Sequence, residues 1–266
     1  MTTIYAFHKG TKPLLVSVPH DGRLLPADIA NRMSAAGLAL PDTDWHVARL
    51  YRFAKRFGAS MLIADFSRYV VDLNRSSDDE ALYDKQLSTG LCPQKTFAGE
   101  DLYQAGRGLT PTEQAQRIKE YWRPYHEQLA ATLQQIKDEH GFALLWDAHS
   151  IRSSVPSLFD GELPDLNIGS NDGASCSADV AAAVAQVAGH TPYTSVLDGR
   201  FRGGFITRHY GDPKNGVCAL QLEIAQRNYM DEDSLDYDRV RARRLAATIE
   251  TMIDVYVAAG SQYCKA

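Results

Sequence analysis

The sequence is poor in cysteine, and the cysteines that it has are scattered. Only four occur in 266 residues, and no CxxC pair is among them (Cys92, Cys176, Cys218 and Cys264). Structural zinc sites use closely spaced cysteines, and disulfide frameworks are typical of short secreted chains. We therefore expect reduced thiols and no cysteine-bound metal.

Long apolar runs are also missing. No stretch reaches the roughly 18 apolar residues that indicate a transmembrane helix. The N-terminus, MTTIYAFHKG, lacks the basic start and apolar stretch of a secretory signal. The formal net charge of -5 repels a polyanion overall, which disfavours nucleic-acid binding but allows a local cationic pocket for a small anion. We expect a cytoplasmic protein with no membrane or nucleic-acid partner.

Internal repeats and low-complexity linkers are absent, so we expect residues 1–266 to form one domain. Hydrophobic residues make up 44% of the chain, which is ordinary for a protein with a sizeable core. Apolar runs typical of buried strands occupy residues 13–20, 61–65, 69–73, 142–150, 191–199 and 217–226.

Helical patterns alternate with these runs. Four helices are predicted, over residues 43–58, 111–141, 178–189 and 234–260. Pro124 is expected to kink or split the second helix. This alternation predicts an α/β fold, a three-layer sandwich with a mostly parallel, mixed central sheet and helices on both faces. The segment 76–110 is polar and shows no period, and we expect it to act as a lid.

Polar side chains able to bind a metal or to move protons fall at the ends of these runs. They are His20, Asp72, Asn74, Arg75, Asp147, His149 and Glu223. Because ligands bind outside the carboxyl ends of strands in open α/β sheets, we expect these groups to converge at one edge. The alternative for each histidine is a structural hydrogen bond at a strand end.

Two of these runs carry acidic residues that suit catalysis. Asp147 and His149 point to the same side of an extended strand, so the carboxylate can orient the imidazole and raise its basicity. Glu223 lies in a run that otherwise looks buried, and unpartnered carboxylates are rarely buried. We interpret Glu223 as a general base. A solvent-facing glutamate on an edge strand is the alternative.

Arginines lie in two segments that could bind an acidic ligand. Arg68 and Arg75 bracket SRYVVDLNR, and Arg202 and Arg208 surround the pair Gly203 and Gly204. A guanidinium group binds a carboxylate through two parallel hydrogen bonds, and glycines let a backbone approach a ligand closely. Solvated arginines around an ordinary turn are the alternative.

A third metal ligand is needed beside two histidines to make a catalytic zinc site. The chain has no HExxH motif, and Arg23 stands three residues after His20, so HxxE is absent too. The remaining candidates lie in PDTDWHV, namely Asp42, Asp44 and His46. Helix N-capping is the alternative for the two aspartates.

A series of motifs covers residues 5–232: PHDG, DTDWHV, SRYVVDLNR, WRPYH, LLWDAHSIRS, NIGSNDGASC, GRFRGGFITRHYG and LQLEIAQRNYM. In this order they resemble the N-formylglutamate amidohydrolase family of histidine degradation. More distantly, the chain is similar to zinc carboxypeptidases and to the aspartoacylase and succinylglutamate desuccinylase enzymes. It departs from these distant relatives at Arg23, which stands in the place of their acidic metal ligand.

The resemblance implies a role for each candidate. His20, Asp44 and His149 would hold one Zn²⁺ or another divalent metal per chain, with Glu223 as the base. An arginine would stabilise the oxyanion, either Arg68 or one from Arg75 and the 202–208 segment, and Asp147 would orient His149. The substrate would be bound by Asn74, Arg75, Arg152, Gly203, Gly204 and Arg208.

The activity implied by the resemblance is metal-dependent hydrolysis of N-formyl-L-glutamate to formate and L-glutamate. The enzyme would act on a small acidic N-acyl amino acid as a monomer or a small homo-oligomer. Two other interpretations stay open. One is a related zinc amidohydrolase for another N-acyl acidic amino acid, and the other is a non-catalytic protein that binds an acidic amino acid.

Overall fold

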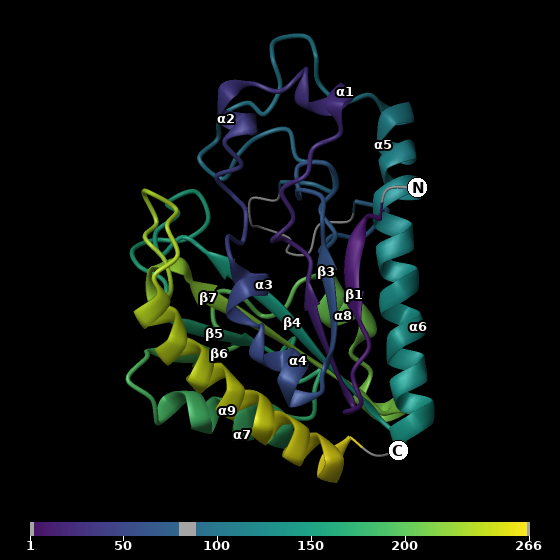
Figure 1. Cartoon of the computed structure of the whole chain (residues 1–266), viewed down its shortest axis with the longest axis vertical. Helices are drawn as coiled ribbons and strands as arrows, with labels where there is room; N and C mark the ends of the chain where they lie inside the picture. The colour runs from purple at the N-terminus through teal and green to yellow at the C-terminus, as the bar shows by residue number, and fades with distance from the viewer. Residues whose placement is uncertain (1–2, 80–88, 265–266) are drawn as a thin grey trace.

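A seven-stranded sheet runs through the centre of the computed structural model, which describes residues 3–79 and 89–264 (Figure 1). The strands follow the spatial order β1-β3-β2-β4-β7-β5-β6. Their bounds are β1 (Tyr5–His8), β2 (Leu14–Val18), β3 (Ser60–Ala64), β4 (Ala143–Ile151), β5 (Leu166–Gly169), β6 (Ser195–Leu197) and β7 (Val217–Ala225).

The middle of the sheet is parallel. Strands β3, β2, β4 and β7 are parallel neighbours, whereas β1 is antiparallel to β3 and β5 is antiparallel to β7. Strand β6 is parallel to β5. The prediction of a mostly parallel, mixed sheet is confirmed. Because β2, β4 and β7 run in one direction, their carboxyl ends meet at one edge, where α/β proteins bind ligands.

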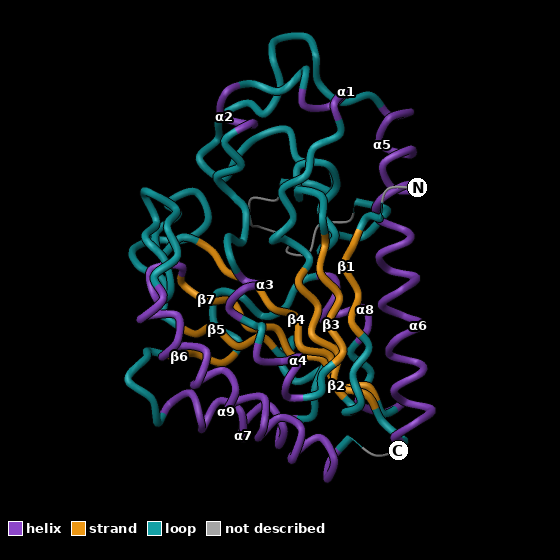
Figure 2. The backbone as a smooth tube through the Cα atoms, viewed as in Figure 1, coloured by secondary structure: helices purple, strands orange, loops and turns teal. Residues whose placement is uncertain are grey.

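Helices cover both faces of the sheet, as the predicted three-layer sandwich requires (Figure 2). One face packs α6 (Arg123–His140) and α8 (Phe205–Tyr210). The other packs α3 (Val47–Leu50), α4 (Phe53–Phe57), α7 (Ala178–Gly189) and α9 (Arg239–Tyr263). The single-turn helices α1 (Ala27–Ala30) and α2 (Ala35–Leu38) lie beyond the end of the sheet (Figure 1). Among the described helices, none combines the length and apolar composition that a membrane span requires.

Alternate residues of each strand belong to different layers. In β4, Leu144 and Trp146 pack into the cluster beneath α7 and α9, whereas Leu145 packs beneath α6. The next residues on the α6 side are Asp147 and His149, because side chains alternate along a strand. On this face, β4 therefore changes from apolar to polar as it approaches its carboxyl end.

The predicted helix over 111–141 forms as one continuous rod with a local defect. It consists of α5 (Pro111–Arg117), a π-helical turn η1 (Ile118–Trp122) and α6. The Arg123 amide bonds to the Ile118 carbonyl, five residues back. Pro124 follows at once and has no N–H for a regular helical bond. The predicted interruption near Pro124 therefore takes the form of a π turn that absorbs one extra residue.

The run 69–73 was predicted as a strand, and this prediction is wrong. It forms turns, and its apolar side chains enter two clusters, Val71 beside α6 and Tyr69 and Val70 near α1. The segment is apolar because its side chains are buried, and this composition resembles that of a strand. In the described sheet, however, no strand pairs with it.

Two helices start later than predicted. The helix expected over 43–58 begins at Val47, because His46 has a left-handed backbone with φ of 66°, and it divides into α3 and α4. The helix expected over 234–260 is α9, which begins at Arg239. Asp238 caps it by accepting hydrogen bonds from two backbone amides of its first turn.

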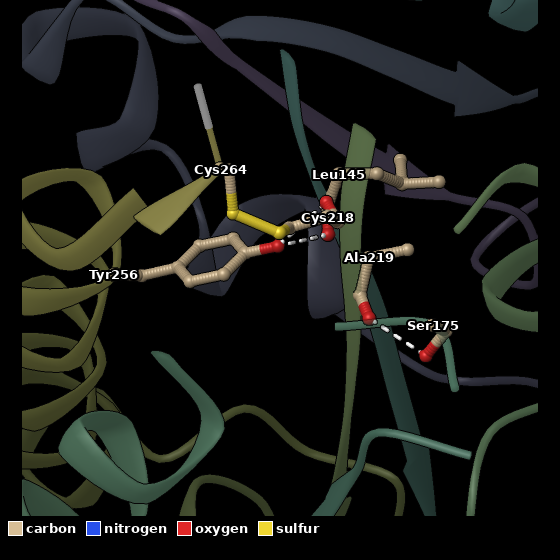
Figure 3. Close-up of a disulfide and its surroundings, with 6 residues drawn as sticks. All are labelled: Leu145, Ser175, Cys218, Ala219, Tyr256 and Cys264. Atoms are coloured by element: carbon tan, nitrogen blue, oxygen red, sulfur yellow. Dashed lines mark hydrogen bonds between the residues drawn. A yellow bond between two sulfur atoms is a disulfide. The ribbon is translucent and has the colours of Figure 1, made fainter. Parts of the chain in front are cut away.

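The expectation of reduced thiols is wrong for one cysteine pair. Cys218 and Cys264 form a disulfide that joins the start of β7 to the end of α9 (Figure 3). The Tyr256 hydroxyl beside it donates to the Cys218 carbonyl at 2.8 Å. The two cysteines are 46 residues apart, and only the packing of α9 on the sheet brings them together. Cys92 and Cys176 are buried free thiols.

Candidate active site

The predicted catalytic groups converge at the carboxyl edge of the sheet. His20 follows β2, His149 lies near the end of β4, and Glu223 lies in β7 as the direct register partner of His149. Asp44 comes from the loop before α3, and its amide donates to the His20 carbonyl at 3.1 Å. All four side chains are buried.

Three of these residues form a cluster with the donor set of a metal site. One ligand atom from each of His20, Asp44 and His149 lies within 4.8 Å of the other two. Asp44 Oδ2 is 3.0 Å from His149 Nδ1 and 3.8 Å from His20 Nδ1. His20 Nδ1 is buried and has no hydrogen-bond partner. A buried orphan nitrogen facing a carboxylate and a second imidazole fits a divalent cation with two nitrogen ligands and one oxygen ligand.

Each imidazole has a carboxylate on its other nitrogen. His20 Nε2 lies 2.8 Å from Asp72 Oδ1, and His149 Nε2 lies 3.0 Å from Asp147 Oδ2. Metal-ligating histidines usually donate their second N–H to such a partner, which fixes the ring and leaves the other nitrogen for the metal. Both rings therefore present Nδ1 to the point that they share with Asp44.

The two histidines differ in their affinity for protons. Burial, reinforced by the Arg68 charge, lowers the pKa of His20 despite the nearby carboxylates of Asp72 and Asp44. Burial opposes protonation of His149 as well, but Asp147 and Asp44 raise the pKa of His149 well above the usual histidine value. His149 therefore holds a second proton in the metal-free protein. Binding of a cation at its Nδ1 has to displace that proton, so metal affinity should increase with pH.

Glu223 has the environment of a general base. Burial raises the pKa of Glu223 to about 8, with His149 and Arg68 opposing the rise and Asp44 and Asp147 adding to it. Gln221, two residues earlier on the same face, donates to Glu223 Oε2 at 3.4 Å. A carboxylate whose pKa lies close to neutrality can both accept and return a proton, as general acid–base chemistry requires.

A cavity of about 100 Å³ opens onto the cluster, and three arginines are among the residues that line it. Its wall includes His20, Asp44, His149 and Glu223 together with Arg68, Arg75 and Arg200. Arg68 donates to Asp72 Oδ2 at 2.6 Å, and its Nη1 lies 3.8 Å from Asp44 Oδ1. The cavity therefore pairs a metal-type cluster with guanidinium groups that suit an anionic ligand.

Several predicted substrate residues border this cavity. Asn74, Arg75, Gly203 and Gly204 line it. Asn74 Oδ1 accepts a hydrogen bond from the Ile206 amide at 2.7 Å, and Asn74 Nδ2 lies 2.9 Å from His149 Nε2. Because Asn74 Nδ2 and the protonated His149 Nε2 are both donors, Asn74 Nδ2 donates instead to Asp147 Oδ2, at 3.4 Å. The Asn74 side chain is therefore held against α8, and it braces His149 through the Asp147 carboxylate.

Two predicted substrate arginines lie outside the cavity wall. Arg152 donates to the Glu232 carbonyl and to Asp233, and it lines a neighbouring cavity of about 460 Å³. Arg208 is not part of the wall, and its Nε donates to the Gly203 carbonyl at 2.8 Å. Through this bond, Arg208 supports the position of Gly203, which is part of the wall.

The geometry distinguishes among the three candidates for the third metal ligand, which were Asp42, Asp44 and His46. Asp42 accepts hydrogen bonds from the Tyr69 hydroxyl and the Phe97 amide. His46 Nε2 lies 2.9 Å from the Leu235 carbonyl. Over residues 3–79 and 89–264, the cluster with metal-ligand spacing contains Asp44 and neither of these two.

Sequence reasoning missed several residues of the site. Asp72 was noted after an apolar run but was given no role, because its partner His20 lies 52 positions away. Arg200 lies in the motif GRFRGGFITRHYG but was given no role, and Phe97 lines the cavity from a segment without a recognisable pattern. Phe97 belongs to the segment 76–110, which was predicted to act as a lid. Residues 80–88 of that segment lie outside the described residues, and the role of the segment stays a prediction.

Comparison with known proteins matches the part of the chain that contains His20, Asp44, His149 and Glu223. The family described as N-formylglutamate amidohydrolase matches residues 12–230, a span that contains the whole cluster. An N-formylglutamate deformylase of Pseudomonas aeruginosa is 49% identical over 265 residues, with 98% of this chain and 99% of the relative covered. A second, from Pseudomonas putida, is 43% identical over 264 residues and covers 98% of both chains.

Solved structures agree with this assignment. The crystal structure of N-formylglutamate amidohydrolase from Ralstonia eutropha JMP134 superposes with a TM-score of 0.83 at 25% identity. The match covers 97% of this chain and 99% of that one. The resemblance inferred from the motifs is therefore confirmed, and the chain belongs to the N-formylglutamate amidohydrolase family.

Proposed function

We propose that the protein is a metal-dependent amidohydrolase that converts N-formyl-L-glutamate and water to formate and L-glutamate. The observation that carries the proposal is the buried, unpartnered His20 Nδ1 facing Asp44 and His149, with Glu223 on the adjoining strand. The names of the two Pseudomonas relatives support the substrate. A place in histidine degradation and a cytoplasmic location are parts of the same proposal.

The residues of the chain divide the work of amide hydrolysis. A divalent metal held by His20, Asp44 and His149, most simply one Zn²⁺ per chain, supplies Lewis acidity to the amide carbonyl and to the attacking water. Glu223 takes the proton from that water and returns it to the leaving nitrogen. Asp72 and Asp147 keep the two imidazoles in the tautomer that ligation needs.

The arginines act on the negative charges of the substrate and of the developing oxyanion. We assign the stabilisation of the oxyanion to Arg68, and its position beside Asp44 supports this role. N-formylglutamate carries two carboxylates, and Arg75 and Arg200 on the cavity wall are the groups that we assign to them. The backbone at Gly203 and Gly204 forms the wall beside these arginines. Asn74 acts by bracing Asp147, the carboxylate that pairs with His149, and Arg208 acts through the Gly203 carbonyl.

An assay of formate release tests this function directly. Purified protein should release formate from N-formyl-L-glutamate, lose the activity in a chelator, and regain it when Zn²⁺ is added back. Elemental analysis should find about one metal ion per chain. Formate release that is unaffected by complete removal of metal would refute the metal dependence.

A panel of substrates separates the proposal from its rivals. N-formyl, N-acetyl and N-succinyl derivatives of glutamate and aspartate should be compared by kcat/KM. A higher value for another acyl group would assign the site to a related amidohydrolase. Tight binding of glutamate with no turnover of any compound would favour a binding protein, although such a protein has no need of a buried base at Glu223.

A further inference from the structure

The WRPYH motif, residues 122–126, has no side chain on the cavity wall. It lies on the rod formed by α5, η1 and α6, which runs along one side of the sheet (Figure 1). Three of its members are nevertheless turned inward, and one of them, Tyr125, is fully buried against the sheet. Trp122 and His126 stack with ring centroids 3.8 Å apart, and His126 is almost fully buried. Their contacts explain why they face inward.

Both side chains donate to the backbone of the segment 68–75. The Trp122 indole N–H donates to the Arg75 carbonyl at 2.9 Å. His126 Nε2 lies 2.9 Å from the Leu73 carbonyl, and only a protonated Nε2 makes a bond with that oxygen. Arg117, one turn earlier on the rod, donates to the Tyr69 and Val70 carbonyls at 3.3 and 2.9 Å.

One face of the rod formed by α5, η1 and α6 thus fixes the backbone of the segment 68–75, which carries several residues of the candidate active site. From this segment, Arg68 and Asp72 reach toward Asp44 and His20, while Asn74 and Arg75 line the cavity. Within residues 3–79 and 89–264, the segment pairs with no strand, so it lacks the ladder of hydrogen bonds that fixes β4 and β7. The carbonyl contacts from the rod take the place of such a ladder.

The π turn brings Arg117, Trp122 and His126 to the same face of the rod. Arg117 and Trp122 are five positions apart, a spacing that lies on different faces of a regular α-helix. The turn at Ile118–Trp122 has i to i+5 bonds, so a five-residue step returns to the same face. Trp122 and His126 are then four positions apart in regular α-helix, which keeps His126 on that face.

His126 is suited to a fixed, neutral role. Burial lowers the pKa of His126 to about 3, despite its bond to the Leu73 carbonyl. The ring therefore keeps one proton, on Nε2, and its Nδ1 accepts from the Tyr210 hydroxyl at 2.9 Å. Tyr210 ends α8, whose Ile206 amide donates to Asn74. His126 thereby links the two elements that hold Asn74.

From these contacts we infer that Trp122 and His126 are positioning residues for the reaction proposed above, on which this inference rests. Trp122 sets the position of Arg75, the residue assigned to a substrate carboxylate. His126 sets the position of Leu73, between Asp72 and Asn74, which hold the imidazoles of His20 and His149. The two residues therefore affect different stages, with Trp122 acting on substrate binding and His126 acting on the metal cluster.

Kinetics of single variants test this division. Trp122→Phe retains an aromatic ring but removes the indole N–H. It should raise KM for N-formyl-L-glutamate about fivefold to tenfold, while kcat stays within about twofold of the wild-type value. His126→Leu should lower kcat and the bound metal per chain more than it changes KM. His126→Gln retains an amide donor, so it should recover part of both losses.

Tyr121→Phe is the matched control. It removes a polar group from the same π turn, and Tyr121 packs against Phe66 rather than against a carbonyl of the segment 68–75. Its KM, kcat and metal content should match those of the wild type. If Trp122→Phe and Tyr121→Phe gave the same KM, or if Trp122→Phe lowered only the melting temperature, the inference would be overturned.

The inference and the proposed function fail in different ways. If the wild type releases no formate from its substrate panel, the function is wrong, whereas metal binding by His126→Leu and His126→Gln still tests the link to the cluster. Wild-type metal content in folded His126→Leu together with wild-type KM in Trp122→Phe would refute the positioning role. If His126→Leu is unfolded, wild-type KM in Trp122→Phe alone would refute it.

Discussion

The two faces of the central sheet are built from the same strands but differ in what they bury. Beneath α7 and α9, β4 presents Leu144, Trp146 and Ala148, all fully buried and apolar. On the α6 side, the intervening residues begin as Ala143 and Leu145 and end as Asp147 and His149. One face is therefore an apolar core as far as Ala148, whereas the other becomes a reaction centre toward its carboxyl end.

This contrast separates stability from chemistry along a single strand. Burial of apolar side chains is favourable, whereas each buried carboxylate must be matched by a partner or it destabilises the fold. On the polar side the partners are found across elements, such as Asp147 with His149 and Asp72 with His20. Substitutions on the apolar face should therefore change the free energy of unfolding, whereas substitutions on the polar face should change kcat and metal content.

His149→Ala should produce the largest change, the loss of both metal and turnover. The variant removes one of the two nitrogen ligands and leaves Asp44 and Asp147 without their shared partner. Elemental analysis and formate release measure the two losses. His190→Ala, at the exposed end of α7, is the control and should keep both. Full metal occupancy in His149→Ala would rule out its role as a ligand.

Glu223→Gln should reduce kcat by about 10²- to 10⁴-fold, the usual contribution of a general base, while the metal content stays unchanged. The amide keeps the size of the side chain but accepts no proton. Glu162→Gln, at an exposed surface position, is the matched control and should leave the rate unaltered. A rate near that of the wild type in Glu223→Gln would mean that another group takes the proton.

Leu144→Ala addresses the apolar face of the same strand. Leu144 is fully buried and lies against Gly260 of α9, so its truncation should lower the free energy of unfolding by about 2–5 kcal/mol. Because the side chain points away from the cluster, kcat of the folded protein should not change. Denaturant unfolding and steady-state kinetics are the two measurements. A large fall in kcat without a loss of stability would contradict the separation of the faces.

Cys264→Ser removes the disulfide at the other end of β7. The bridge closes a loop between positions 46 apart, and its loss should lower the free energy of unfolding by about 2–4 kcal/mol. Its distance from the carboxyl edge predicts unchanged kcat. Reduction of the wild type with dithiothreitol should reproduce the lower stability, and should have no further effect on Cys264→Ser.

The pH dependence should give the smallest effect. Burial raises the pKa of Glu223 to about 8 in the metal-free protein, and a nearby cation lowers such a pKa. Only the ionised carboxylate accepts a proton, so kcat/KM should fall as the pH falls through the pKa of Glu223, at a pH below 8 in the metal-loaded enzyme. The residual activity of Glu223→Gln should lack this acid limb. An unchanged limb in that variant would assign it to another group.

Much of the sheet and the centre of the site could be predicted from the sequence. The buried strands β2, β3, β4 and β7 are recognisable in the sequence as apolar runs. His20, His149 and Glu223 can be predicted to lie together because parallel strands share a carboxyl edge. Asp44 required the family resemblance, because an aspartate before a helix is more often a cap.

The remaining features depend on contacts that local pattern does not encode. The turns at 69–73 have a strand-like composition because they are buried on several sides. The pairing of Asp72 with His20, and of Cys218 with Cys264, joins positions 52 and 46 residues apart. Strands β1 and β5, of four residues each, are too short for a period to be seen.

Gly204 meets Asn74 so closely that a Cβ atom there would lie 2.3 Å from the Asn74 amide nitrogen. Even alanine would displace the side chain that braces His149 through Asp147, although Gly204 itself binds no metal and moves no proton. A side chain at position 204 would therefore act on the site from outside it, so the start of α8 and the cluster of His20, Asp44 and His149 are mechanically connected through Asn74.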